Sequence, residues 1–550
     1  MYSKEKLDVK ARDTLQIQRL ADGFNVPADL TDGEQWGGRI KKTLKVAGWR
    51  LEQDGHDNYS LLEAMKVCLS DFYFAQKRGD SRYAMFIPVS KKSNKPRNVN
   101  FASVYNCQSP RDVGTPIEKT EAGRVRPAAP GFYYCHNVYL CPVDAALIMS
   151  GRNEELHVII DKAHKEGKGV AMLTLTAPHY SVMPLLECSG KMQAAWEYMT
   201  NSRGWKNGIK APRLYFEHTK KNDGKAYSFN VGGWGLLYYS KSMETKVGGK
   251  NGWHNHFHIL LIFDGWLSDI DLVVVEATIR RLWEKACEKV GLLGQSAKQR
   301  KDFRNHAVSL TKDFDADYLA KQSEEWKKAR HVSDTWGAAE ELTLGQCKKR
   351  STPLSESEKG SMTVFEYVFH MCERARAGEY EGQEGLVKLR HDIDLIIEYG
   401  CAMWGRSSIQ FSRGLRDWAG LVEKDDKQIA EEVREVARPI CMMDNAQIKF
   451  IKSQMAYKPV KKALEINHEI AIPIINDWLT SCGFHPLWSA EDADLFIRGR
   501  AGLCAEDELS RLSLLVNTLH RIKDGREEIT TVSSPASPAP PLFEQLNLGF

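Results

Sequence analysis

Several features that define whole classes of protein are missing from this chain of 550 residues. No run of about 18 apolar residues is present, so no membrane-spanning helix is expected. The amino-terminal residues lack the apolar core of a secretory signal peptide. The phosphate-binding pattern GxxxxGK(S/T) is also absent, which argues against a built-in ATP-driven helicase. We therefore expect a cytoplasmic protein that does not contact a membrane.

Cysteine is sparse, and neither sign of charge dominates. The 12 cysteines are scattered without a dense framework, so we expect reduced thiols rather than disulfides. The net charge of +4 is mildly basic, which permits binding to nucleic acid without demonstrating it. The length allows about two to four domains, and no internal repeat is evident.

A histidine-rich stretch, Trp253–His258, leads directly into an apolar run. The β-branched and aromatic residues of that run predict a buried strand. Because alternate side chains of a strand share a face, His254, His256 and His258 should project together. Imidazoles about 6–7 Å apart along a strand can converge on one divalent metal ion. The alternative is three histidines that only fill a sheet face, which would be costly without a polar role.

The residues before this stretch predict its hairpin partner. They alternate in polarity and are followed by a glycine-rich segment, 246–252, which is typical of a turn. In such a hairpin Glu244 would lie nearly opposite His254 and His256. A carboxylate beside two imidazoles suits Mn²⁺ or Mg²⁺ with coordination positions left open for a phosphate. We expect His256, His258 and Glu244 as ligands, with His254 as the alternative third ligand.

Two further segments carry candidate residues. Residues 170–176 alternate apolar side chains with threonine and predict a strand, and His179 after it is a candidate for lining a site. Farther on, Asp315, Tyr318 and Lys321 would share one face of a helix. A tyrosine has a pKa of about 10, so its attack at neutral pH needs a metal-polarised phosphate and a nearby cation such as Lys321. The alternative is a surface helix with an ordinary tyrosine.

In their order along the chain, these segments resemble the motifs of plasmid rolling-circle replication initiator (Rep) proteins, which are HUH single-strand endonucleases. The two histidines that flank Phe257 in an apolar strand are the most specific of the motifs. The similarity extends over roughly residues 130–420. The matching stretches are Leu173–Thr176, Glu244, Gly252–His258, Tyr318–Lys321, Trp336–Thr343 and Ser412–Arg416.

This resemblance implies a fold and an activity. The fold would be α+β, with an HUH-type central antiparallel sheet, flanking helices and a mostly helical C-terminal domain. The protein would initiate rolling-circle replication by nicking single-stranded or extruded origin DNA. Matched to the motifs, His256 and His258 would bind the metal and Tyr318 would be the nucleophile. The tyrosine would form a 5′-phosphotyrosine link and leave a 3′ hydroxyl as primer for a host polymerase.

One departure from the family concerns the closing step. Some members carry a glutamate four residues before the tyrosine to activate water, and this chain has Phe314 there. Asp315 or Asp317 is the candidate substitute, and Lys321 is expected to stabilise the phenolate or the scissile phosphate. Two alternatives to an initiator stay open: an HUH transposase or relaxase with the same chemistry, or a non-catalytic DNA-binding protein whose histidines hold a structural metal.

A cysteine-bearing segment precedes the predicted endonuclease core. Cys135, Cys141 and Asp144 resemble the zinc-ribbon-like lead-in of the family, with Asp144 in the place of its last cysteine. Cys107 would supply a further ligand, which gives three thiolates and one carboxylate for a structural Zn²⁺. The alternative is a group of buried free thiols.

Basic and aromatic residues are interleaved between two of the core segments. Lysine and arginine can contact phosphates while bases stack on aromatic rings, which would suit single-stranded DNA. The alternative is a solvated loop. The residues are Arg203, Lys206, Lys210, Arg213, Lys220, Lys221 and Lys225, with Trp205, Tyr215 and Phe216.

The end of the sequence predicts a partner. Residues 530–541 are rich in serine, proline and alanine and predict a disordered linker. The final residues resemble the short peptide by which bacterial replication proteins bind the sliding clamp, through Gln545, Leu546, Leu548 and Phe550. A frayed end or a strand packed back on the protein is the alternative.

These features divide the chain into six expected parts. The helical C-terminal domain is expected to contact duplex origin DNA or a host helicase. The parts are an extension of unknown role (1–100), the zinc-ribbon-like lead-in (101–160), the endonuclease core (161–355), the helical domain (356–529), the linker (530–541) and the clamp-binding peptide (542–550).

Overall fold

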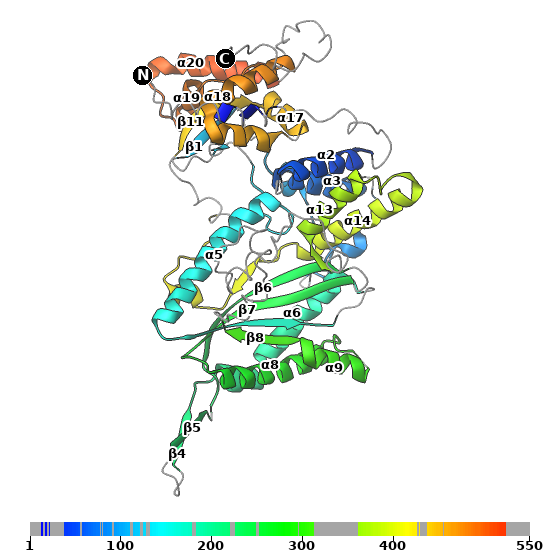
Figure 1. Cartoon of the computed structure of the whole chain (residues 1–550), viewed down its shortest axis with the longest axis vertical. Helices are drawn as coiled ribbons and strands as arrows, with labels where there is room; N and C mark the ends of the chain where they lie inside the picture. Colours follow the sequence, from blue (N-terminus) through cyan, green and yellow to red (C-terminus); the bar gives the residue numbers. More distant parts are fainter. Residues whose placement is uncertain are drawn as a thin grey trace, which may run out of the picture. The chain divides into compact units, whose positions relative to one another are not determined.

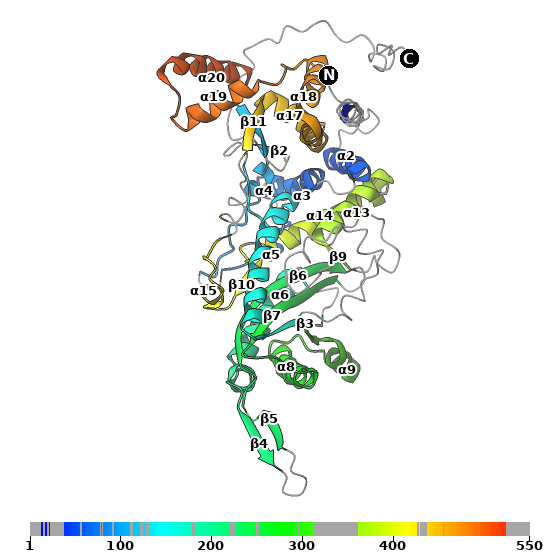
Figure 2. The same ribbon diagram turned by 60° about the vertical axis from the view of Figure 1, so that its left-hand side comes forward.

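The structure, a computed structural model, divides the chain into two compact units that are each assembled from distant segments (Figures 1 and 2). One unit comprises Asp32–Tyr105 and Tyr134–Val433, and the other comprises Met1–Thr31, Asn106–Tyr133 and Arg434–Phe550. The residues that the structure describes are 13–14, 17–18, 21, 38–54, 58–77, 79, 81–90, 93–109, 114–120, 125–127, 133–178, 183–219, 226–230, 232–248, 252–294, 296–312, 361–425, 428, 437–454 and 456–523.

The larger unit is built on an antiparallel sheet, as the sequence predicts. Its strands run in the order β10-β6-β7-β3-β8, and β9 also pairs with β6. The strands are β3 (Gly169–Thr176), β6 (Leu236–Gly248), β7 (Gly252–Phe263), β8 (Val308–Lys312), β9 (Ser361–Thr363) and β10 (Ile409–Phe411).

The β6–β7 hairpin is longer than its sequence suggests. We expected the turn to span 246–252, but Lys246 pairs with His254 and Gly248 with Gly252 inside the ladder. That part of the expectation was wrong. The cause is that pairing with β9 and β7 on its two sides holds this glycine-containing segment in an extended form.

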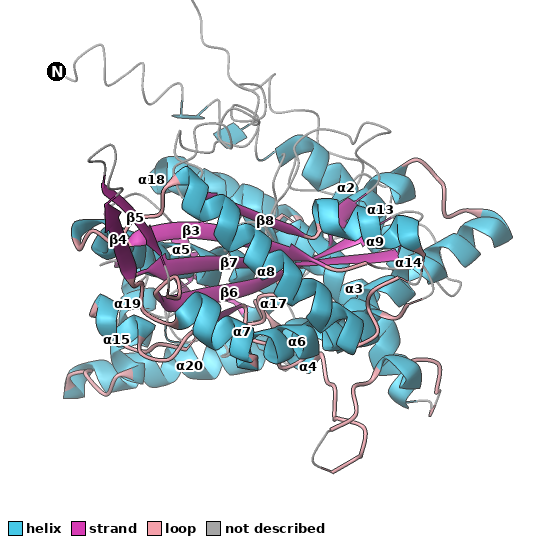
Figure 3. Ribbon diagram, turned by 90° about the horizontal axis from the view of Figure 1, so that it is seen from below, coloured by secondary structure: helices cyan, strands magenta, loops and turns pink. Residues whose placement is uncertain are grey.

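Helices cover the two faces of the sheet and explain its apolar pattern. Phe257 is fully buried on the face that carries α6 (Leu185–Asn201) and α8 (Asp269–Lys289), where its ring contacts Trp196 and Trp283. In Figure 3 helix α8 lies across the strands. On the opposite face, α5 (Pro142–Lys165) packs its leucine and isoleucine side chains onto the apolar half of β7. The histidine half of that face carries polar side chains instead.

Four further helices of this unit pack together beside the sheet. They are α2 (Gly38–Asp54), α3 (Asn58–Lys77), α13 (Val364–Arg376) and α14 (Gly382–Met403). The buried carboxylate of Asp392 on α14 joins that helix to α13 and to the turn between them by accepting hydrogen bonds from Tyr367 and Tyr380, each at 2.6 Å, beside Arg374 at 3.1 Å. Residues from before position 100 and after position 360 therefore share one helical layer.

The smaller unit combines a short sheet with helices around its own core. Its sheet has the order β11-β1-β2, and Met442 of β11 packs among leucines of the last two helices. Its elements are β1 (Gly114–Thr120), β2 (Val125–Pro127), β11 (Ala437–Asp444), α17 (Asn445–Ser453), α18 (Tyr457–Ser481), α19 (Ala490–Arg500), η5 (Glu506–Glu508) and α20 (Leu509–Lys523).

The protein is α+β, and the chain after residue 361 is mostly helical, as the sequence predicts. Among the described helices none is long and apolar enough to cross a membrane. The remaining elements of the larger unit are η2 (Ala84–Phe86), α4 (Ala102–Asn106), α7 (Arg203–Trp205), η3 (Lys206–Lys210), β4 (Tyr215–Thr219), β5 (Ala226–Asn230), α9 (Ala297–His306) and α15 (Leu415–Ala419).

Candidate metal centre

One face of the central hairpin carries the residues that the sequence singles out as metal ligands. Glu244 on β6 lies directly opposite His256 on β7. On the other side of β7, Thr176 and Thr174 of β3 pair with His256 and His258. Directly opposite residues of an antiparallel pair point to the same face. Three adjacent strands therefore build one polar patch, next to the apolar region that α5 covers.

A single carboxylate oxygen joins the two histidines. The Oε2 atom of Glu244 lies 3.1 Å from Nε2 of His258 and 3.6 Å from Nε2 of His256. The other ring nitrogen of His258, Nδ1, lies 3.4 Å from the hydroxyl of Thr174. A metal-binding histidine is usually oriented in this way by a contact at its second nitrogen. The hairpin thus holds three donor atoms close together.

The environment of His256 keeps its imidazole neutral. Burial lowers the pKa of His256 well below its usual range, and the neighbouring His254, His258 and Lys246 lower it further against the opposing pull of Glu244. Its Nε2 atom is buried and makes no hydrogen bond within the described part of the chain. A neutral imidazole with an unshared ring nitrogen is the form that binds metal ions.

Two of the distances in this donor set match those around a divalent ion. Adjacent ligands of an octahedral ion with bonds of about 2.1 Å lie about 3 Å apart. The observed separations of 3.1 and 3.6 Å from the Glu244 oxygen are close to that value. Two imidazoles and one carboxylate would also leave coordination positions open, so His256, His258 and Glu244 are candidate ligands for Mn²⁺ or Mg²⁺.

Two neighbours modify this site. The ring of His254 lies 4.2 Å from that of His256 and is tilted by 51° to it, whereas Glu244 reaches both His256 and His258. These distances favour Glu244 over His254 as the third ligand. Lys246 places its ammonium group 3.1 Å from Oε2 of Glu244. Lys246 was not among the predicted site residues, because the glycines that follow it indicated a turn; in the extended β6 it lies on the same face as Glu244.

A buried glutamate fixes the start of the histidine strand. Glu398 of α14 accepts a hydrogen bond from the indole Nε1 of Trp253 at 2.9 Å. Its second oxygen accepts one from the backbone N–H of Leu185, the first residue of α6, at 2.6 Å. Glu398 thereby ties three elements together one residue before His254. Nothing in the local sequence around Glu398 indicates this role, since its partners lie far away in the chain.

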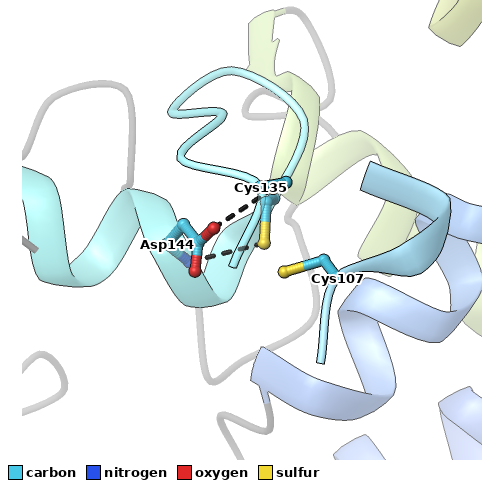
Figure 4. A group of neighbouring side chains, drawn as sticks. Cys107, Cys135 and Asp144 are labelled. Carbon is cyan, nitrogen blue, oxygen red and sulfur yellow. Dashed lines mark hydrogen bonds between the residues drawn. The ribbon is translucent and has the colours of Figure 1, made fainter. Parts of the chain in front are cut away.

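The cysteine-bearing lead-in also brings its four expected residues together. One ligand atom each from Cys107, Cys135, Cys141 and Asp144 all lie within 4.8 Å of one another. Cys141 caps the start of α5 by accepting the backbone N–H of Asp144 at 3.4 Å, and the thiol of Cys135 donates to Oδ2 of Asp144 at 3.1 Å. Figure 4 shows Cys107, Cys135 and Asp144 turned toward one another. Three thiols and a carboxylate are a donor set for tetrahedral Zn²⁺.

The basic cluster is partly a set of structural residues. Trp205 is buried and packs against Trp196, so the expectation that it stacks on bases was wrong. Its position on α7 turns the indole into the core. Arg213 also has intramolecular partners: it donates to the carbonyl of Trp266 at 2.7 Å and to Asp271 at 3.1 Å.

Several expected site residues lie outside the described part of the chain. These are His179, Asp315, Tyr318, Lys321, Lys220, Lys221, Lys225, and the tail residues Gln545, Leu546, Leu548 and Phe550.

Fold and site together define an α+β protein whose central antiparallel sheet carries a candidate metal centre of two histidines and a glutamate. Over 328 residues the chain is 23% identical to a curated protein from Streptomyces lividans named "Protein rep". The match covers 54% of this chain and 66% of that relative, so the chain spans just under two thirds of the relative's length. No protein-family model matches the chain, and no solved structure matches it.

Proposed function

We propose that this protein is a Rep-type replication initiator that nicks single-stranded origin DNA by metal-assisted attack of a tyrosine. The observation that carries the proposal is the convergence of Glu244, His256 and His258 on one polar patch of an antiparallel sheet. The similarity to "Protein rep" supports the role in replication and DNA as the partner.

The residues of the patch have distinct tasks in this proposal. A bound Mn²⁺ or Mg²⁺ would supply charge to polarise the scissile phosphate. His256 remains neutral and offers a lone pair, because its pKa lies well below its usual range. Glu244 contributes the negative charge that the ion requires. Thr174 holds the ring of His258 in the orientation needed for binding.

The nucleophile of the proposed reaction is Tyr318. Its hydroxyl oxygen forms a bond to phosphorus while the bond from phosphorus to the 3′ oxygen breaks. The tyrosine proton passes to Asp315, and the leaving 3′ oxygen takes up a proton to become a hydroxyl. Lys321 stabilises the negative charge that develops on the tyrosine oxygen or on the scissile phosphate. The phosphotyrosine bond retains the energy of the phosphodiester, so the strand can be rejoined without ATP.

Two further parts belong to the proposal. Zn²⁺ bound by Cys107, Cys135, Cys141 and Asp144 would stabilise the lead-in. The carboxyl-terminal peptide that includes Gln545 would recruit a host sliding clamp, and with it a polymerase, to the new 3′ end, and a host helicase would open the duplex. Deleting 545–550 should then abolish capture of a bacterial sliding clamp on beads, and retained capture would remove the clamp from the proposal.

The test is covalent capture of DNA. Wild type, Tyr318→Phe and Tyr198→Phe are each incubated with Mn²⁺ and a labelled single-stranded pool that contains the origin region, and are then run on a denaturing gel. Tyr198 is a partly exposed tyrosine of α6 and serves as the control. We expect a protein–DNA adduct with wild type and Tyr198→Phe, and none with Tyr318→Phe.

Other outcomes would change the proposal. An adduct with all three proteins would move the nucleophile to another tyrosine and keep the class. The absence of an adduct from every protein would overturn the nicking activity and favour a non-catalytic DNA-binding protein.

A further inference from the structure

A pocket of about 610 Å³ opens beside β10, the strand at one edge of the central sheet. Pockets that bind small ligands measure about 300–1,000 Å³, so this one can hold a nucleotide. Near it α15 packs against α5 through Leu415 and Leu156. Figure 2 shows α15, β10 and α5 in this region. The lining residues are Arg152, Ser407, Ile409, Gln410, Phe411, Arg416, Glu423, Lys424, Asp425 and Gln428.

The pocket lies on the same face of the sheet as the candidate metal centre. Ile409 in its lining is paired with Ser242 of β6, and Ser242 is paired with His258. Paired residues share a face, as do residues two apart on one strand, so Ile409, Ser242 and Glu244 point the same way. Two residues of a strand span about 7 Å. One DNA strand can therefore contact the metal centre and the pocket together.

Two arginine side chains meet at the inner wall of the pocket. Arg152 donates to Oε2 of Glu155 at 2.8 Å, and Arg416 lies 3.4 Å from that same oxygen. Two guanidinium groups thus share one carboxylate. Arg152 and Glu155 are buried, and the side chain of Arg416 is only 14% exposed. The acidic lining residues Glu423 and Asp425 are exposed, so solvent screens their charge.

A contact with Phe411 holds the guanidinium of Arg416 in place, and its Nε–H group is left available as a hydrogen-bond donor. Its Cζ atom lies 4.2 Å from the centre of the Phe411 ring, a cation–π contact that fixes the guanidinium plane. Its Nε atom is buried and has no hydrogen-bond partner in the described residues. Arginine presents five N–H donors in a rigid fork that matches a phosphate. The pocket therefore supplies a donor for an anionic acceptor, and the described residues do not provide one.

We infer that this pocket binds one nucleotide of the single strand near the nick, with its phosphate on Arg416. The inference rests on the proposed function for the identity of the strand. Arg416 and Arg152 would neutralise the phosphate, while the amides of Gln410 and Gln428 and the hydroxyl of Ser407 offer hydrogen bonds to the base edge. The pocket would thereby help to set which sequence is placed at the metal centre. A free nucleotide has the same chemistry, and the experiment separates the two sources.

The test compares two arginines of the same turn. Arg416→Met removes the fork but leaves the Arg152–Glu155 pair balanced in charge. Arg413→Met removes the same charge from an exposed position that does not line the pocket. Arg416→Lys keeps the positive charge and removes the paired N–H donors of the guanidinium. Its affinity for the strand therefore tests the pocket even if the methionine variant folds poorly. Each protein is titrated against a labelled single strand selected by binding from a random pool, and against dAMP.

We expect Arg416→Met to bind the selected strand about tenfold more weakly, as for the loss of a charge-assisted hydrogen bond. The slope of log affinity against log salt should fall by about 0.7, the value for one lost phosphate contact on a single strand. Arg416→Lys should keep the slope and lose affinity, and Arg413→Met should match wild type. A single neutral methylphosphonate in the strand should weaken wild type at one position and leave Arg416→Met unchanged there.

Equal affinities of Arg416→Met, Arg413→Met and wild type would overturn the inference. The inference would also be overturned if dAMP binding depended on Arg416 and strand binding did not. The pocket would then bind a free nucleotide. The proposed nicking activity fails separately, through the absence of a covalent adduct, because strand affinity is measured without cleavage.

Discussion

The two faces of β6 carry buried charged groups that meet opposite environments. On one face the carboxylate of Glu244 lies 3.1 Å from both His258 and Lys246. On the other face the ammonium group of Lys241 donates to the uncharged amide of Gln193 at 2.8 Å and lies 4.0 Å from the centre of the Phe257 ring.

The contrast between Glu244 and Lys241 shows that a buried charged group needs a partner of opposite charge or a bound ion to remain charged. Burial and the nearby positive charge of Arg406 together lower the pKa of Lys241 to about 7, and the attraction of Glu197 offsets only part of their effect. Lys241 thus gives up its proton near neutral pH, whereas Glu244 has nitrogen partners placed as they would be around a metal ion. The same strand therefore carries a candidate binding site on one face and a packed core on the other.

The largest effect should come from removing a histidine ligand. His258→Ala is expected to abolish Mn²⁺ binding and DNA nicking, because loss of a direct ligand should exceed the roughly 10–100-fold cost of losing an outer contact. Isothermal titration with Mn²⁺ measures this. His306→Ala, which changes an exposed histidine at the end of α9, is the control and should bind as wild type does. Full Mn²⁺ affinity in His258→Ala would refute the site.

The opposite face is tested by Lys241→Met, which keeps the contacts with the aromatic rings and removes the charge. Below about pH 7 Lys241 is protonated in both the folded and the unfolded chain, so the full cost of burying its charge is present. Above that pH the folded protein binds fewer protons than the unfolded chain, and the stability of wild type rises with pH. The variant lacks this dependence.

We expect Lys241→Met to raise the free energy of unfolding by about 2–4 kcal/mol at about pH 6, with a smaller gain at about pH 9. Urea unfolding at the two pH values measures the difference. Lys191→Met changes a partly exposed lysine of α6 and should alter stability by less than about 0.5 kcal/mol. A gain that does not depend on pH would show that Lys241 keeps its proton in the folded protein over this range, which would contradict the lowered pKa.

A third prediction concerns which residue, Glu244 or His254, is the third metal ligand. Glu244→Ala should weaken Mn²⁺ binding by more than about tenfold, while His254→Ala should change it by less than about threefold, because only Glu244 lies between both of the other donors. Titration of the two variants side by side decides the matter. The reverse order would assign the third position to His254.

The smallest effect concerns the contact at the second nitrogen of His258. Thr174→Val keeps the shape of the side chain and removes the hydroxyl that lies 3.4 Å from Nδ1. We expect Mn²⁺ affinity to fall by about tenfold with little change in the melting temperature. Ser309→Ala, on the neighbouring strand β8, is the matched control. An unchanged affinity would mean that packing alone orients the ring of His258.

Much of the site could be predicted from the sequence because its signals are local. Alternation along β6 and β7 and the glycines between them place Glu244 opposite His256, as the structure confirms. Lys246 was missed because the pairing of β9 that extends the strand involves residues more than a hundred positions later. The same limit applies to Glu398, whose two hydrogen bonds join α14 to Trp253 and α6.

The fold, like the site, has features that follow from local sequence and features that depend on distant pairing. The α+β class follows from the strand-like and helical segments, each of which is readable by itself. The position of β10 beside β6 is not readable, because Ile409–Phe411 is short and its partner lies more than 160 residues earlier. The two units also combine segments from both ends of the sequence, and no property of one stretch of chain indicates that assembly.

The shortness of the chain between the donor atoms has a consequence for how the molecule acquires its site. Glu244, His256 and His258 fall within 15 consecutive residues of one hairpin. Local pairing loses little loop-closure entropy and is fast, so this hairpin can form before the strands and helices encoded after residue 360 exist on the ribosome. The pocket at β10 can be completed only later. Synthesis itself would then order the assembly, with the donor atoms in place before the residues proposed to select the DNA.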